Sequence, residues 1–170
     1  MSAPAFVDSN VLVYWVDGSD PVKQQRASLW VEELWKGRSG RISFQVLQEF
    51  FYAATKKKPE IVEKIRAEVR HLLAWHPVSV DPSLLELAWK IQDRYHFAFW
   101  DALIVAAAKA ASCRWLLTED LQSGQNLATH PFPFREWVGR WIGHDRVVAD
   151  RWRCQLERIA GQLLLEGLQV

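Results

Sequence analysis

Short segments typical of strands alternate with longer amphipathic segments along this chain, and this alternation restricts its fold more than any other feature. The strand-like segments lie at 5–7, 41–43, 77–80 and 115–118. Between them, apolar residues recur at helical spacing, most clearly over 46–54. Strands that alternate with helices predict a parallel sheet with helices on both faces, joined by right-handed crossovers. We therefore expect an α/β fold with at least four strands.

Two Asp-Pro pairs, at 20–21 and 81–82, mark the expected starts of two helices. In each pair the aspartate would cap the helix and the proline would occupy its first position, where a missing N–H costs nothing. Ser9 is expected to cap the first helix, which would end near Gly18. The caps therefore predict where several of the helices begin.

The segment 130–133, His-Pro-Phe-Pro, is the clearest break in the chain. Beyond it, residues 134–142 and 152–163 carry apolar side chains at helical spacing. We therefore expect one α/β domain over residues 1–130. A C-terminal helical extension over 131–170 would pack on that domain or on a partner.

Composition excludes several classes of protein. A chain of 170 residues fits one domain, and its net charge of +1 gives no overall basic field to attract a polyanion. The two cysteines, Cys113 and Cys154, lie far apart and favour neither a disulfide framework nor a zinc site. No apolar stretch approaches the roughly 18 residues of a membrane span. We expect a soluble, cytoplasmic protein without membrane contact.

Two carboxylates follow expected strands at the edge of the sheet where sites form in open parallel sheets. Asp8 ends the first strand, and Asp120 lies two residues beyond Thr118, the end of another strand. The sequence thus predicts that both acids lie at the carboxyl edge of the sheet.

Asp101 is the one polar residue among twelve between Phe97 and Ala108. A helix that is apolar all round is buried, and an ionised carboxylate there is costly unless it is paired or binds a metal. Two structural alternatives remain. Asp101 could cap its helix or lie in its first turn, where the helix dipole favours it, or it could form a buried ion pair, although the closest basic residue before it in sequence is Arg94.

Glu49 is expected at the flank of the apolar stripe of its helix, beside Val46. Taken alone, Glu49 could lie at the boundary between the buried and exposed faces of the helix, with its carboxylate hydrogen-bonded to water. Its significance therefore depends on the other three acids. Four carboxylates close together repel one another unless a divalent cation binds them. Oxygen ligands favour Mg²⁺ or Mn²⁺ over Zn²⁺, and one or two such ions could activate water against a phosphodiester.

Four segments of the chain resemble, in order, the motifs of PIN domains, especially those of VapC-type toxins in toxin–antitoxin pairs. Each motif alone is weak, but together they cover about residues 5–127. The segments are Phe6–Tyr14, Ser43–Phe50, Phe97–Ala108 and Leu116–Leu121, the last followed by Gly124-Gln125.

This resemblance implies a PIN-like three-layer fold with a parallel sheet of four or five strands. It also implies an endoribonuclease that depends on Mg²⁺ or Mn²⁺ and acts on RNA, a cognate antitoxin protein as partner, and often a homodimer. The motifs assign catalysis and metal binding to four acids and auxiliary roles to two polar residues. These residues are Asp8, Glu49, Asp101 and Asp120, with Asn10 and Thr118 at the edge of the site.

Several departures and alternatives accompany the resemblance. Ser9 stands where threonine is common, Glu119 beside Asp120 leaves a small ambiguity of register, and the chain continues some 40 residues past the usual end. Thr118 could bond a carboxylate or a metal-bound water, or simply end its strand. Lys56, Lys57 and Lys58 could match a helix dipole or contact phosphate. The rival hypothesis is a non-catalytic PIN scaffold that binds RNA or protein.

Overall fold

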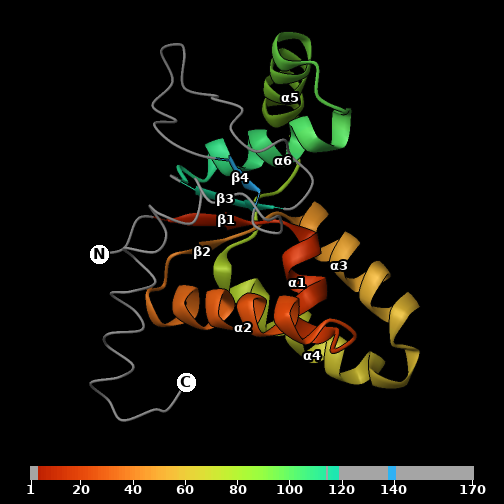
Figure 1. Cartoon of the computed structure of the whole chain (residues 1–170). Coiled ribbons are helices and arrows are strands. Elements are labelled where there is room, and N and C mark those ends of the chain that lie inside the picture. Colours follow the sequence, from red (N-terminus) through yellow and green to blue (C-terminus); the bar gives the residue numbers. More distant parts are fainter. Residues whose placement is uncertain (1–3, 114, 119–137, 141–170) are drawn as a thin grey trace.

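The computed structural model describes residues 4–113, 115–118 and 138–140. Within these residues, one parallel sheet has the strand order β2-β1-β3-β4, so β1 lies between β2 and β3 (Figure 1). The expected parallel sheet flanked by helices is confirmed. The strands are β1 (Ala5–Val7), β2 (Gly40–Arg41), β3 (Trp115–Thr118) and β4 (Val138–Arg140).

Helices lie on two sides of the sheet. α5 and α6 pack together on one side, and α1, α2, α3 and α4 lie on the other (Figure 1). The helices are α1 (Ser9–Val16), α2 (Pro21–Lys36), α3 (Phe44–Lys57), α4 (Val62–Leu72), α5 (Pro82–Tyr95) and α6 (Phe99–Ala110), with short 3-10 turns η1 (Pro59–Ile61) and η2 (Leu73–Trp75) beside α4.

The two Asp-Pro starts are confirmed. The Asp20 carboxylate accepts hydrogen bonds from two backbone amides of α2, and Asp81 accepts one from Leu84 N at 2.8 Å. The expected cap at Ser9 is wrong, because Asp8 caps α1 and Ser9 is its first residue. Strand β1 ends at Val7 and leads directly into the helix, so the aspartate already occupies the capping position.

Two expected strands differ from what the structure has. The strand expected at 41–43 lies at Gly40–Arg41, and 77–80 contributes only an isolated bridge between Ser43 and Val78. Ser43 caps α3, so the chain turns into a helix before a longer ladder can form. The bridge has two backbone bonds, Phe44 N to Val78 O at 3.0 Å and Val78 N to Ile42 O at 2.9 Å.

The helix expected over 134–142 is wrong at 138–140. These residues form β4, which pairs in parallel with β3. The pairing provides hydrogen-bond partners for backbone groups of β3 on the side away from β1. The rest of 131–170 lies outside the described residues, so the domain limits at 1–130 and 131–170 stay a prediction.

Gly40 is required by the packing around β2. A Cβ atom at this position would lie 2.5 Å from Cε2 of Trp75, whose side chain is buried. The absence of a side chain therefore lets the indole of Trp75 pack directly on the first residue of β2. Among the described helices, none is both long and apolar enough to cross a membrane.

Candidate active site

The carboxylate of Asp8 lies at the carboxyl end of β1, beside the end of β3. The register pairs Val7 with Leu117, and Asp8 N donates to Leu117 O at 2.9 Å. This pairing brings the Asp8 side chain to Thr118, whose Oγ1 donates to Asp8 Oδ2 at 2.6 Å. Both side chains are buried, and Thr118 is fully so. The aspartate is therefore held by the sheet itself.

The first turn of α1 supplies further donors to Asp8. Ser9 N donates to Asp8 Oδ1 at 2.6 Å. The Asn10 amide nitrogen lies 3.4 Å from Asp8 Oδ2 and donates to Thr118 Oγ1 at 3.3 Å. An ionised carboxylate can accept all of these bonds, because both of its oxygens are acceptors, and it is also favoured at a helix N-terminus. The local structure therefore suits Asp8 in its charged form.

Glu49 reaches the same place from α3. Ser9 Oγ donates to Glu49 Oε2 at 2.9 Å and also lies 3.3 Å from Asp8 Oδ1. Because one hydroxyl carries one proton, the shorter contact identifies Glu49 as its acceptor. On the other side, Gln45 Nε2 donates to Glu49 Oε1 at 2.8 Å. Two acids from distant segments thus meet at a single serine hydroxyl.

Asp101 lies in the first turn of α6 and is half-buried, while the seven residues that follow it are buried. Its position matches the first-turn alternative, since α6 begins at Phe99. Within residues 4–113, 115–118 and 138–140, no three His, Cys, Asp or Glu side chains are grouped to hold a metal ion. The fourth acid, Asp120, lies outside the described residues, so the structure brings Asp8 and Glu49 together and leaves the full quartet a prediction.

The donor set of the two acids fits a hard divalent cation. Each offers carboxylate oxygens, the ligands that Mg²⁺ and Mn²⁺ prefer. In the part of the chain that the structure describes, Glu49 is held by the neutral donors Ser9 and Gln45, and no salt bridge to it is found. Ser9 and Gln45 therefore orient the Glu49 carboxylate without pairing it with a positive charge, as a ligand of a cation requires.

Ser9 and Gln45 are the site residues that sequence reasoning missed. Ser9 was expected as a helix cap and as a motif position where threonine is common, and Gln45 only as part of a motif, so neither was expected to bond Glu49. A signal for Gln45 exists, because a residue four positions before Glu49 shares its helix face. The link from Ser9 to Glu49 spans 40 positions and has no local signal.

The PIN domain model matches residues 5–123, which is more than half of the chain. The chain belongs to the PIN domain family. Domains of this family are generally nucleases that typically use divalent metal ions and act on RNA. The matched segment contains every residue that the motifs assigned, from Asp8 to Asp120. A comparison with curated proteins gives no match.

Proposed function

We propose that this PIN domain is an endoribonuclease that depends on Mg²⁺ or Mn²⁺ and hydrolyses phosphodiester bonds of RNA. The observation that carries the proposal is the serine-linked pair of acids, Asp8 and Glu49, at the carboxyl edge of the sheet. Acids are rarely brought together in a protein without a cation to hold, because like charges at short range repel.

In this proposal Asp8, Glu49, Asp101 and Asp120 would hold the ion, which when bound would supply Lewis-acid chemistry that activates a water and offsets the charge of the phosphate. The chain's own residues orient the ligands. Thr118 fixes one oxygen of Asp8, while Ser9 and Gln45 fix the Glu49 carboxylate. Such outer partners set the direction of ligand oxygens and typically affect metal affinity strongly.

The biological role that we propose is that of a toxin in a toxin–antitoxin pair, acting as a homodimer in the cytoplasm. Its support is the resemblance of the segments 6–14 and 97–108 to VapC-type toxins. Expression of the chain should arrest growth of a bacterial host, and co-expression of the cognate antitoxin should restore it. Growth that continues at high expression of soluble protein would contradict the toxin role.

The alternative is a PIN scaffold that binds RNA or protein without cutting. The presence of all four acids in the sequence argues against it, since a scaffold that does not cut would have no need to keep all four motif carboxylates. Cleavage of a labelled RNA with Mn²⁺ separates the two proposals. We expect wild type to cut, and Glu49→Gln to cut at least about 100-fold more slowly, since ligand positioning commonly carries such factors.

The matched control is Glu60→Gln, which makes the same change at an exposed glutamate of η1. This variant should cut as wild type does. Asp101→Asn tests a ligand that the serine link does not include, and it should also be slow. Equal cleavage by wild type, Glu49→Gln and Asp101→Asn would refute the enzymatic proposal, as would the absence of any Mn²⁺-dependent cleavage.

A further inference from the structure

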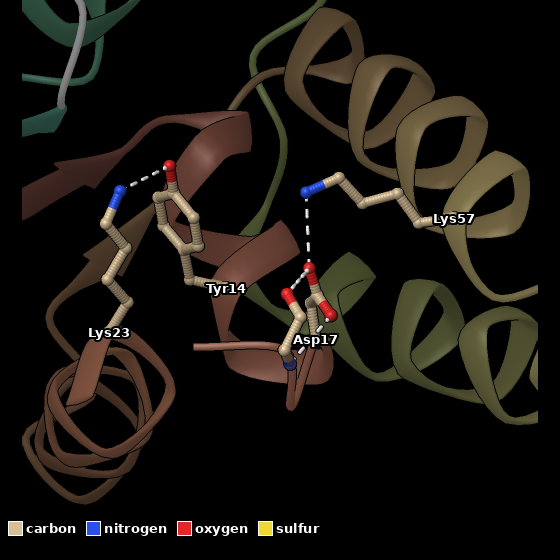
Figure 2. A network of polar contacts seen from close by, with 5 residues as sticks. Tyr14, Asp17, Lys23 and Lys57 are labelled. Carbon is tan, nitrogen blue, oxygen red and sulfur yellow. Dashed lines mark hydrogen bonds and ion pairs between the residues drawn. The ribbon is translucent and has the colours of Figure 1, made fainter. Parts of the chain in front are cut away.

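A second contact joins α1 to α3 at the ends of these helices that lie away from Ser9 and Glu49. Lys57 Nζ lies 3.2 Å from Asp17 Oδ2 (Figure 2). Asp17 is the C-cap of α1, and Lys57 is the last residue of α3. This ion pair is therefore placed to fix one helix against the other.

The two contacts between these helices are separated by the same number of residues on each side. Asp17 follows Ser9 by eight residues, and Lys57 follows Glu49 by eight residues. Eight residues of α-helix rise about 12 Å. Since α1 and α3 pack against each other (Figure 1), both contacts can form together in only one axial register of the two helices. We call the contact from Ser9 to Glu49 the inner rung and the contact from Lys57 to Asp17 the outer rung.

Asp17 is a firm anchor for the outer rung. Its side chain is only 4% exposed, and it accepts hydrogen bonds from Ser19 N at 3.1 Å and Ser19 Oγ at 2.8 Å. Burial acts to raise the pKa of Asp17, but the bonds from Ser19 and the charge of Lys57 outweigh it and lower the pKa. The carboxylate is thus ionised and fixed, and Lys57 reaches to it from α3.

We propose that the Asp17–Lys57 ion pair is a positioning pair that sets the register of α3 against α1 and so places the Glu49 carboxylate beside Asp8. The inner rung, from Ser9 Oγ to Glu49 Oε2, is 2.9 Å long. A hydrogen bond weakens steeply once the helices shift by about 1 Å, far less than the roughly 5.4 Å of a full turn. The importance of this register for metal binding rests on the function proposed above.

A different use of Lys57 would be contact with the phosphates of RNA. Its neighbour Lys56 distinguishes the two, because Lys56 is also exposed near the end of α3 but lies 5.9 Å from the ring of Tyr52 instead of pairing with Asp17. Removing either lysine takes one positive charge from the same helix end. Only removal of Lys57 breaks the outer rung.

The test compares Lys57→Met with Lys56→Met in the full chain. Mn²⁺ affinity is measured by calorimetry. RNA affinity is measured at several salt concentrations, which also gives its dependence on salt. We expect Lys57→Met to weaken Mn²⁺ binding by up to about 5-fold, the range of an ion pair with one exposed partner, and Lys56→Met to leave it unchanged. Lys57→Arg keeps the charge and should restore the affinity.

Asp17→Asn removes the opposite partner and should lower Mn²⁺ affinity to the same extent as Lys57→Met. The double variant should lose no more than either single variant, because both remove one interaction. Equal Mn²⁺ affinity of the Lys57→Met and Lys56→Met variants would overturn the proposal. Equal loss of RNA affinity and of salt dependence in both, with Mn²⁺ affinity intact, would assign Lys57 to phosphate contact instead.

A measurement without metal separates this inference from the proposed nuclease function. The ¹³C chemical shift of the Glu49 carboxyl group reports whether Ser9 still donates to it. The shift should change in Lys57→Met and stay constant in Lys56→Met. If wild type fails to bind Mn²⁺ while this difference is seen, the nuclease proposal fails and the positioning role stands. No difference in the shift would refute the positioning role.

Discussion

The bond from Thr118 to Asp8 offers the sharpest test of how the sheet holds the site. Thr118→Val replaces the fully buried hydroxyl by a methyl group of similar size, so the packing of β3 is kept. What is lost is the 2.6 Å bond from Thr118 Oγ1 to Asp8 Oδ2, together with the longer bond of 3.3 Å that Thr118 Oγ1 accepts from Asn10. The Asn10 amide, at 3.4 Å from Oδ2, is a longer and weaker donor than the hydroxyl that is removed.

The size of the effect follows from the charge of the acceptor. Hydrogen bonds to charged groups contribute about 1.5–3 kcal/mol to the free energy of unfolding. For a chain of this length, that loss corresponds to a decrease in Tm of roughly 3–12 °C. Since Asp8 loses the group that orients it, we also expect Mn²⁺ affinity to fall at least about 10-fold.

Thr118→Ser is the matched control. It keeps the hydroxyl and removes a buried methyl group, at a cost of about 1 kcal/mol. Urea unfolding gives the stabilities, and calorimetry gives the affinities for Mn²⁺. The reasoning would be refuted if the valine variant matched wild type within about 0.5 kcal/mol. It would also be refuted if the serine variant lost more Mn²⁺ affinity than the valine variant.

Three further predictions concern the surrounding fold. Gly40→Ala should lower the free energy of unfolding by about 1–3 kcal/mol in urea, because the new methyl would lie 2.5 Å from a ring atom of Trp75. The pKa of Asp17 is lowered from 3.8, so its ionised form stabilises the fold above that pH and the contribution disappears as pH falls through the lower folded value. Urea unfolding of wild type and Asp17→Asn should therefore differ most near neutral pH and converge in acid. Burial raises the pKa of Cys113 to about 12, so in a Cys154→Ser variant this thiol should resist labelling near neutral pH until the protein unfolds.

Each of these predictions has a control or a contrary result. Gly18→Ala places its methyl 3.5 Å from the flexible Gln24 side chain and should cost little, so equal losses at Gly18 and Gly40 would contradict the packing argument. A stability difference at Asp17 that grows as pH falls would have the wrong sign. Labelling of Cys113 as fast as that of a cysteine in the unfolded protein would contradict the argument from burial.

Local signals in the sequence were enough for much of the fold. The aspartate caps at 20 and 81 were predicted because a cap and its proline are neighbours in the chain. The strands β1 and β3 were predicted from short apolar runs. By contrast, β4 forms where a helix was expected, because the open edge of β3 supplies partners that no local pattern records.

The candidate site divides in the same way. Asp8 could be predicted from its place after a strand, and its bond with Thr118 follows from strand pairing that the alternation implies. The bond between Ser9 and Glu49 could not be predicted, since it depends on how closely two helices pack. The side chain of Asp101 was expected within a buried helix, yet it occupies the half-buried first turn. An apolar composition alone does not fix the residue at which a helix begins.

Anomalous X-ray diffraction from a crystal soaked in Mn²⁺ tests the central claim most directly. The account predicts an anomalous peak within about 2.0–2.5 Å of oxygens from both Asp8 and Glu49. In a crystal of Glu49→Gln the peak should weaken or vanish. A fully soaked crystal with no peak at these two carboxylates, or with Mn²⁺ bound only elsewhere, would contradict the account.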